Sequence, residues 1–319
     1  MDLDTLRSIC LAHPGATEEV QWENHLLFKV GGKMFCVTNL DDANGRAIWA
    51  LGYLISMSDV LPDACRSIQQ EAGSILESAL LNINKIHSTR AMAFIIKGVY
   101  YHNTKIQSAR DTALIGELAD RLAAMYMHET DKEWHWFERY LTYANSILPE
   151  AMLCAWLATG KLEYNEIAKS SFDFLLSKTF RDNSINVISN KNWMHKGQAP
   201  ATAIAGGEQP IDVAYTILAL SKFYDVFNDA EDRSKMETAF TWFLGNNHLH
   251  QVIYNPCTGG CYDGLEENYV NLNQGAESTV SYLMARLTME KYSRKDQNNT
   301  KAKAILSPNK LPLGTGIQY

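Results

Sequence analysis

Apolar residues recur at helical spacing through most of the chain, and five of these segments are apolar on nearly every side. Each of the five begins at a turn residue (Gly, Thr or Pro), carries a charged residue in its first turn and continues as an Ala-rich apolar body. This pattern predicts helices that are buried on most sides. The five segments are 45–55, 89–96, 149–157, 210–220 and 275–284.

More amphipathic segments lie between these buried helices. They cover residues 62–83, 107–128, 163–178 and 231–246, and their charged faces are typical of helices in an outer layer. The repeating unit is therefore an inner helix paired with an outer helix. Hairpins of this kind, arranged around an axis, form an α/α toroid, in which neighbouring hairpins bury one another's apolar faces and the starts of the inner helices meet at one mouth.

A closed toroid of six hairpins needs twelve helices, and only nine are predicted here. We therefore predict a mainly α fold, an incomplete (α/α)6 toroid that lacks its first hairpin or so. A short helix over 3–11, a loop and a β-hairpin precede it. The two strands of this hairpin, 25–30 and 33–38, are joined by the turn Gly31-Gly32.

The sequence predicts three parts in all. Residues 1–42 form the helix and hairpin segment, residues 43–292 the toroid, and residues 293–319 an irregular tail that is rich in breakers and lacks periodicity. An incomplete toroid leaves the apolar flanks of 43–55 open. We therefore expect either the N-terminal hairpin or a second copy of the chain, in a homo-oligomer, to cover them.

Composition and charge narrow the classes of function. The 319 residues include 36 acidic and 29 basic ones, for a net charge of −7, so no basic field is available to recruit nucleic acid. No leader pattern begins the chain, and no apolar segment approaches the length of a membrane span. We therefore expect a cytoplasmic protein that binds neither nucleic acid nor a membrane.

The cysteines do not indicate a metal or a disulfide scaffold. There are six of them, and they are scattered. Cys257 and Cys261, with His248 and His250 upstream, could form a zinc site, but zinc sites use tighter cysteine spacing and residues 258–260 read as a turn. Neither a Walker-type loop, a G-x-S-x-G elbow nor a G-x-G-x-x-G after a strand occurs. We predict no metal and no cofactor.

The most unusual local composition is Trp134-His-Trp-Phe-Glu138, which leads to Tyr143, Asn145 and Glu150. Aromatic rings stack on the C–H faces of sugars while acids and amides bind hydroxyls, so this composition suits a carbohydrate subsite. The alternative is that the tryptophans are core anchors that close a helical hairpin. His135 could act as an acid or base, or be a hydrogen-bonded structural residue.

Two further stretches place acids near predicted helix starts. In Gly206-Gly-Glu-Gln-Pro-Ile-Asp212, Pro210 fits the first helical position, with Gln209 as the cap and Asp212 in the first turn. Asp263 lies on a tight loop, and Asn273 is a predicted N-cap of a helix that carries Glu277 in its first turn. That helix is expected to bury Ala276, Val280, Leu283 and Leu287 on one face.

These acids suggest glycoside cleavage, which needs two carboxyl groups across the bond, one of them protonated. Desolvation by the neighbouring tryptophans would favour Glu138 as the acid, with Asp212 or Asp263 as the base. The predicted catalytic residues are Glu138, Asp212, Asp263 and Glu277. The predicted substrate-binding residues are Trp134, His135, Trp136, Tyr143, Asn145, Glu150, Gln209, Tyr262, Asn273 and Gln274.

Six stretches together resemble the six-hairpin family of α/α-toroid carbohydrate-active proteins, and more narrowly the toroidal domains found with bacterial glycosyltransferases and sugar-phosphorylase systems. They are NGRAIWALG (44–52), WHWFE (134–138), LPEA (148–151), QPID (209–212), GCYDG (260–264) and NQGAES (273–278). The resemblance implies a toroid with a sugar-binding mouth and no settled reaction. Relatives carry a further Asp-Asp motif on an earlier inner helix. In this chain only Asp41-Asp42 weakly resembles that motif.

The N-terminal stretches LRSICLAHPGATEE (6–19) and FKVGGKMF (28–35) resemble the opening of the small MmcQ/YjbR-like domains. Only the first part of such a domain is present, so its function is not carried over.

Two hypotheses follow for the toroid. It is either a glycoside hydrolase-like enzyme that acts on an oligosaccharide or polysaccharide, or a non-catalytic carbohydrate-binding or docking module of a glycosyltransferase system. If all of the predicted acidic residues serve as helix caps, the non-catalytic module is favoured.

Overall fold

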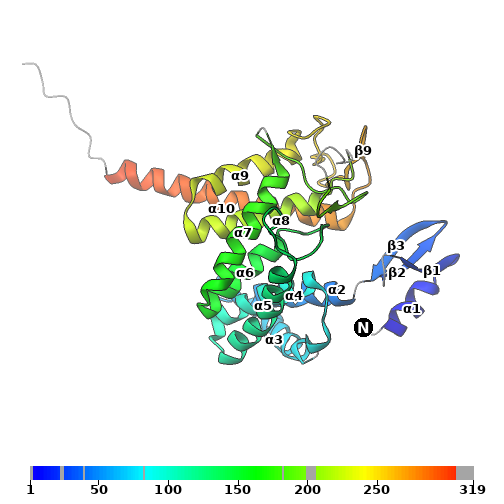
Figure 1. Cartoon of the computed structure of the whole chain (residues 1–319), viewed down its shortest axis with the longest axis horizontal. Coiled ribbons are helices and arrows are strands. Elements are labelled where there is room, and N and C mark those ends of the chain that lie inside the picture. The colour runs from blue at the N-terminus through cyan, green and yellow to red at the C-terminus, as the bar shows by residue number, and fades with distance from the viewer. Residues whose placement is uncertain are drawn as a thin grey trace, which may run out of the picture. The chain divides into compact units, whose positions relative to one another are not determined.

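The computed structural model describes residues 3–21, 25–38, 40–81, 83–181, 183–198 and 206–306, and it is mainly α-helical (Figure 1). The chain divides into two compact units. Unit 1 contains residues 1–178 and 195–197, and unit 2 contains residues 179–194 and 198–319.

The N-terminal part of unit 1 contains the predicted helix and hairpin. Helix α1 (Leu3–Leu11) is followed by β1 (Ala16–Gln21), β2 (His25–Val30) and β3 (Lys33–Thr38), which form an antiparallel sheet in the order β1-β2-β3. Gly31 and Gly32 both have positive φ, +57° and +77°, as the tight turn between β2 and β3 requires. The predicted hairpin is thus confirmed.

The segment predicted as a loop after α1 is a strand instead. β1 pairs with β2 along its whole length, from Ala16 opposite Val30 to Gln21 opposite His25. An ion pair between Lys29 and Glu19 (2.5 Å) joins the two strands. Buried Cys10, Leu26 and Phe28 form a small core between α1 and the sheet. This core stabilises the hairpin to which β1 is added as a third strand.

Six further helices of unit 1 follow the predicted alternation of inner and outer helices. They are α2 (Leu40–Ser56), α3 (Arg66–Leu80), α4 (Thr89–Ile106), α5 (Ala109–Glu129), α6 (Ile147–Thr159) and α7 (Leu162–Thr179). α4 packs against α2, α5 and α6, and every residue from Thr89 to Val99 is buried. The predicted inner helix at this position is therefore confirmed. α2 begins at Leu40, so the predicted boundary after residue 42 falls inside this helix.

α2 and α4 touch through their backbones. A Cβ atom added at Gly52 of α2 would lie 2.0 Å from the carbonyl oxygen of Gly98 on α4, and one added at Gly98 would lie 2.5 Å from that of Ile48. Only glycine fits at such a distance. Beside this contact, Trp49 stacks on Phe94 with ring centroids 5.7 Å apart.

The described residues of unit 2 form three long helices, α8 (Pro210–Phe227), α9 (Ala230–Thr241) and α10 (Ala276–Leu306). α8 packs against both α9 and α10, and it is buried almost throughout from Pro210 to Ser221. Single-turn 3₁₀ helices span Asp63–Cys65, Ile83–Lys85 and Trp242–Leu244. The remaining strands have two residues each: β4 (Tyr140–Leu141), β5 (Phe180–Arg181), β6 (Ser184–Ile185), β7 (Met194–His195), β8 (Gly264–Leu265) and β9 (Val270–Asn271).

The buried face of α10 is not the predicted one. Val280, Leu283 and Leu287 are exposed by 53%, 47% and 64%, and Ala276 is exposed as well. As far as residue 294, where burial is described, the buried side chains on this helix are Ser278, Ser281, Tyr282, Ala285 and Tyr292. Tyr282 packs into an aromatic cluster with Phe240, Phe243 and Tyr254, and the Tyr292 hydroxyl bonds to Ser221 of α8 (2.7 Å).

The segment predicted to be irregular from residue 293 is helical as far as Leu306, because α10 continues to that point. Residues 293–306 contain no Gly or Pro, and the first breaker is Pro308. The rest of the predicted tail, 307–319, lies outside the described residues.

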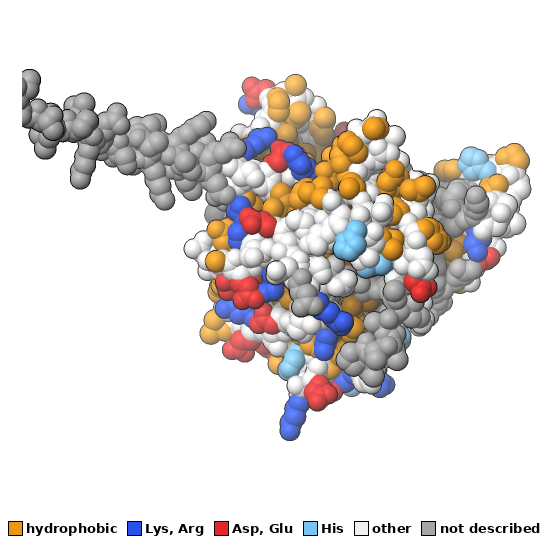
Figure 2. All heavy atoms as spheres, turned by 90° about the horizontal axis from the view of Figure 1, so that it is seen from above, with side chains coloured by type: hydrophobic (Ala, Val, Ile, Leu, Met, Phe, Trp, Pro, Cys, Tyr) orange, Lys and Arg blue, Asp and Glu red, His pale blue; other side chains and the backbone are white. Residues whose placement is uncertain are grey.

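Among the residues that the structure describes, none of the helices combines the length and apolar character needed to cross a membrane. Basic and acidic side chains are interspersed on the face shown in Figure 2.

Candidate functional site

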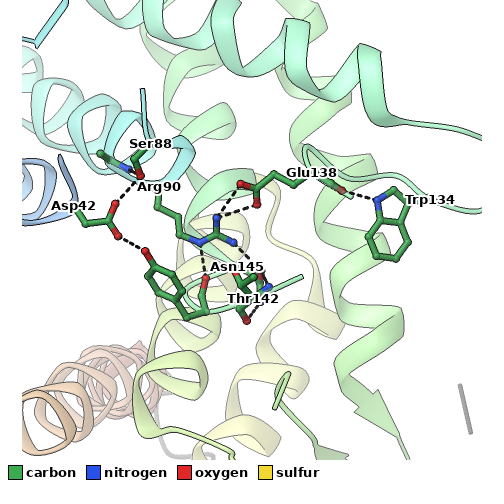
Figure 3. Close-up of polar contacts among 9 residues, drawn as sticks. Asp42, Ser88, Arg90, Trp134, Glu138, Thr142 and Asn145 are labelled. Atoms are coloured by element: carbon green, nitrogen blue, oxygen red, sulfur yellow. Dashed lines mark hydrogen bonds and ion pairs between the residues drawn. The ribbon is translucent and has the colours of Figure 1, made fainter. Parts of the chain in front are cut away.

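The starts of α2, α4 and α6 meet in unit 1 through a group of polar side chains (Figure 3). We name it the Arg90 cluster. It consists of Asp42, Ser88, Arg90, Glu138, Tyr143 and Asn145. The predicted site residues Glu138, Tyr143 and Asn145 are thus brought together, and Arg90 links all three.

Arg90 is 5% exposed and donates from each of its three guanidinium nitrogens. Nε donates to the carbonyl oxygen of Tyr143 (2.7 Å), Nη1 to both carboxylate oxygens of Glu138 (3.1 and 2.9 Å), and Nη2 to Oδ1 of Asn145 (3.3 Å). The guanidinium also lies 4.9 Å from the centre of the Tyr143 ring. A buried cation held by this many acceptors fixes the loop before α6 against α4.

Asp42 connects the start of α2 to the same cluster. Its carboxylate accepts hydrogen bonds from Ser88 Oγ (2.7 Å) and from the Tyr143 hydroxyl (2.5 Å). The neighbouring Asp41 accepts from the backbone N–H groups of His87 and Ser88. Burial, together with the Asp42 carboxylate, raises the pKa of Tyr143 well above its usual value, so the phenol remains a donor across the neutral range.

The predicted aromatic residues before Glu138 lie in the core. Trp134 is 6% exposed and Trp136 is fully buried. The Trp134 ring packs edge-on against Phe174 with centroids 5.0 Å apart, and its Nε1 donates to the carbonyl oxygen of Glu138 (2.7 Å). His135 is half-buried and also lies beside Phe174. Of the two alternatives, the positions of both tryptophans fit core anchors.

Glu150 lies apart from the Arg90 cluster, inside the helix packing of unit 1. Its carboxylate forms an ion pair with Lys97 (2.7 Å), and the two side chains are 2% and 0% exposed. The Lys97 ammonium lies 4.0 Å from the centre of the Trp49 ring. Glu150 therefore joins α6 to α4, and its carboxylate is occupied by a protein partner.

In unit 2, the loops before α8 and α10 are joined to each other. Glu208 and Leu265 exchange two backbone hydrogen bonds (3.1 and 2.9 Å). Asp263, close to Leu265 in the chain, accepts hydrogen bonds at Oδ1 from Gly275 N (2.8 Å) and Ser278 Oγ (2.7 Å), and at Oδ2 from Asn273 Nδ2. Asp263 therefore caps the start of α10 from across the loop.

Asn273 does not cap a helix as predicted, because α10 begins three residues later, at Ala276. Its side chain binds Asp263 instead. Gln274 and Glu277 are both exposed. Gln274 accepts a hydrogen bond from Thr258 (2.6 Å), and Glu277 lies in the first turn of α10.

The start of α8 follows the prediction closely. Gln209 is the N-cap residue, Pro210 begins the helix and Asp212 lies in the first turn. Asp212 is 7% exposed and Gln209 is half-buried. Tyr262 is also half-buried, and its hydroxyl accepts a hydrogen bond from Asn255 (3.1 Å).

Glu208 was not selected from the sequence, yet it is buried just before the start of α8. It contacts two side chains, Trp242 through Nε1 (2.9 Å) and His248 through Nδ1 (2.7 Å). Burial raises the pKa of Glu208, although these two partners act in the opposite direction. We name Glu208, Trp242 and His248 the Glu208 cluster.

The residues considered for a zinc site differ in burial and in partners. Cys257 is exposed, Cys261 is buried, and His248 is bound to Glu208. Across the described part of the chain, no group of three or more His, Cys, Asp or Glu residues could hold a metal ion.

Two residues that the sequence analysis missed did carry a signal. Arg90 stands in the first turn of a predicted inner helix, where a cation opposes the helix dipole, so it needed specific acceptors. Asp42 is the second residue of the pair Asp41-Asp42, which weakly resembles the Asp-Asp motif of the relatives, and it is 6% exposed. Buried charges are paired, and such a partner can only be found once distant segments are in place.

No protein-family model and no curated protein matches the chain. Solved structures do match. A D-mannose isomerase is similar at a TM-score of 0.54 and 14% identity, over 83% of this chain and 75% of that chain. A GH76 α-mannanase from Bacteroides thetaiotaomicron reaches a TM-score of 0.55 at 10% identity, over 92% of this chain and 80% of that chain. A cellobiose 2-epimerase from Bacillus thermoamylovorans reaches 0.55 at 12% identity, over 80% and 71%.

At these identities the likeness shows the fold alone. The mainly α toroid fold predicted from the alternating inner and outer helices is confirmed.

Proposed function

We propose that the chain is a carbohydrate-active protein that binds an oligosaccharide or polysaccharide at the starts of its inner helices. The observation that carries the proposal is the gathering of carboxylates, amides and hydroxyls at these starts in both units. Sugars are recognised by such groups, because each hydroxyl can both donate and accept. The toroid neighbours support the same class, since they act on mannose, mannan and cellobiose by their names.

For the reaction, we propose acid/base glycoside processing with Glu138, Asp212, Asp263 and Glu277 as the catalytic candidates. Hydrolysis needs one carboxyl group that gives a proton and a second that attacks or activates water. Glu277 is exposed on the first turn of α10, where a carboxylate is stabilised by the helix dipole. It is therefore the candidate most accessible to a substrate.

The second candidate is a non-catalytic carbohydrate-binding or docking module of a glycosyltransferase system. One observation favours it: the catalytic candidates Glu138 and Asp263 already have protein partners. Glu138 accepts both of its hydrogen bonds from Arg90, and Asp263 caps α10. Carboxylates held in this way position a loop without taking part in proton transfer.

For the N-terminal segment, we propose a truncated MmcQ/YjbR-like module. Its helix and three strands enclose a core of their own, which supports a separate origin from the helices that follow.

The test combines a glycan array with chromogenic glycosides and an NMR assay for isomerised or epimerised sugars. Under the enzyme proposal, Glu277→Gln abolishes turnover of the substrate found while its binding persists. Glu133→Gln, which removes an exposed carboxylate of unit 1, is the matched control and leaves turnover unchanged. Binding without turnover for the natural chain supports the module, and an array without any bound glycan contradicts both candidates.

A further inference from the structure

Both ring nitrogens of His248 face an acceptor oxygen. Nδ1 lies 2.7 Å from Oε1 of Glu208, and Nε2 lies 3.0 Å from the carbonyl oxygen of Glu266. A carbonyl oxygen has no proton to give, so the proton between Nε2 and Glu266 belongs to His248. In this arrangement Nε2 is therefore a donor.

The contact between Nδ1 and Glu208 must then hold a second proton. Without it, a lone pair on Nδ1 would face a carboxylate oxygen at 2.7 Å, which is repulsive. The proton lies either on Glu208, which then donates to His248, or on an imidazolium that donates to the carboxylate. In both states the pair carries one shared proton, which is a property of the pair and not of either residue.

The surroundings of the pair favour keeping this proton. The Glu208 side chain is 8% exposed, and its second oxygen already accepts from the uncharged indole of Trp242. Burial raises the pKa of Glu208. The other charged groups around the pair are engaged with one another. Glu266 forms an ion pair with Lys191 (2.5 Å), and Glu267 and Tyr269 lie near the same lysine.

We propose that Glu208 and His248 form a proton-sharing latch that holds three segments of unit 2 together and loosens when the proton is lost. These segments are 206–209 before α8, 246–251 after the 3₁₀ helix Trp242–Leu244, and 264–266, which begins with β8. This inference goes beyond the carbohydrate proposal, because the latch needs no sugar to form.

The direction of the pH dependence follows from proton linkage. The folded chain keeps a proton that a free glutamate loses as pH rises, so the contribution of the latch to stability is complete at acidic pH. It is lost as pH rises through the folded pKa of the pair. Above that point, His248 has one ring proton for two acceptor oxygens, so one of its two contacts, to Glu208 or to Glu266, is lost.

Glu208→Gln tests this in the full chain. The amide of glutamine can donate to Nδ1 and accept from Trp242, so it reproduces the protonated pair without a proton that can be lost. The measurement is the melting temperature from pH 5 to pH 9, for the natural chain and for the variant. We expect the melting temperature of the natural chain to fall relative to that of Glu208→Gln as pH rises.

Glu267→Gln is the matched control. It removes an exposed carboxylate of the same loop region, and its melting temperature should follow that of the natural chain at every pH. A constant difference between the natural chain and Glu208→Gln across the pH range overturns the proposal.

A second measurement does not depend on the variant being folded. In ¹⁵N NMR of the natural chain, the latch predicts that the signals of the His248 ring nitrogens change when the shared proton leaves the pair. Ring signals that stay constant from pH 5 to pH 9 overturn it.

Discussion

The Arg90 cluster of unit 1 and the Glu208 cluster of unit 2 both stand where inner helices begin, but their charges are balanced in different ways. Arg90 is a permanent cation, and all three of its nitrogens donate to fixed oxygens. Among the described residues, Glu208 pairs with no Lys or Arg, and it is balanced by a proton shared with His248. The first arrangement is therefore indifferent to pH near neutrality, whereas the second depends on it.

The two clusters also differ in what they hold. The Arg90 cluster ties three helix starts together through side chains, so its loss is felt by α2, α4 and α6 at once. The Glu208 cluster lies beside loops that already share backbone hydrogen bonds between Glu208 and Leu265. The first cluster should therefore dominate stability, and the second should modulate it.

Removal of the Arg90 side chain gives the largest expected effect. Arg90→Met leaves Glu138 and the Tyr143 carbonyl buried without their donor, and breaking a buried ion pair in this way costs about 3–5 kcal/mol of unfolding free energy. Urea unfolding at neutral pH measures it. The control is Arg110→Met, which removes an exposed ion pair with Glu77 and should change the unfolding free energy by no more than about 0.5 kcal/mol. Equal effects of the two variants would contradict the role of the Arg90 cluster.

Tyr143→Phe should have the next largest effect, because it removes a side-chain hydrogen bond to the buried Asp42 carboxylate. Hydrogen bonds to charged groups contribute about 1.5–3 kcal/mol. Since folding raises the pKa of Tyr143, its contribution is complete below the pKa of a free tyrosine and is lost only in strong alkali. Urea unfolding should therefore give the same difference at pH 5, 7 and 9. A difference that changes over this range would remove the contrast with the Glu208 cluster.

Asp263→Ala should cost less, about 0.5–2 kcal/mol, because it removes a helix cap. Gly275 and Ser278 lose their acceptor, so the first turn of α10 should fray while the rest of unit 2 stays folded. Hydrogen exchange of the amides from 275 to 280 measures this locally. Unchanged protection there would show that Asp263 is free for another role, which favours the enzyme proposal over the binding module.

Glu277→Gln should have the smallest effect on stability, within about 0.5 kcal/mol, because Glu277 is exposed. Thermal unfolding checks this. A loss of sugar turnover in this variant can then be assigned to chemistry. A large loss of stability would show instead that Glu277 has a structural partner.

The helices could be predicted from the sequence because the local spacing of apolar residues indicates which segments are buried. α8 shows this, since Gln209, Pro210 and Asp212 occupy the predicted cap, first and first-turn positions. The face of α10 could not be predicted in the same way. Val280 and Leu283 form the more apolar stripe, but the packing surface of this helix consists of small and aromatic side chains that fit α8 and the aromatic cluster.

The candidate site could be predicted in part. Glu138, Tyr143 and Asn145 stand out because acids, amides and aromatic residues are concentrated before a helix break. Their shared partner Arg90 is about fifty residues away in the chain, and Asp42 is about a hundred residues from Tyr143. No local pattern reports such pairings, because they depend on how the helices pack. The environment of Glu208 depends in the same way on Trp242 and His248.

The backbone contact between Gly52 and Gly98 has a consequence for the Arg90 cluster. Gly98 lies eight residues after Arg90 on the same helix, which is a rise of about 12 Å. The spacing of α2 and α4 is thus set at this contact and at a second close approach nearer the entrances, between Gly45 and Ala91. A single methyl group added at Gly52 or Gly98 would spread the helices and misalign Asp42 from Ser88 without touching either residue.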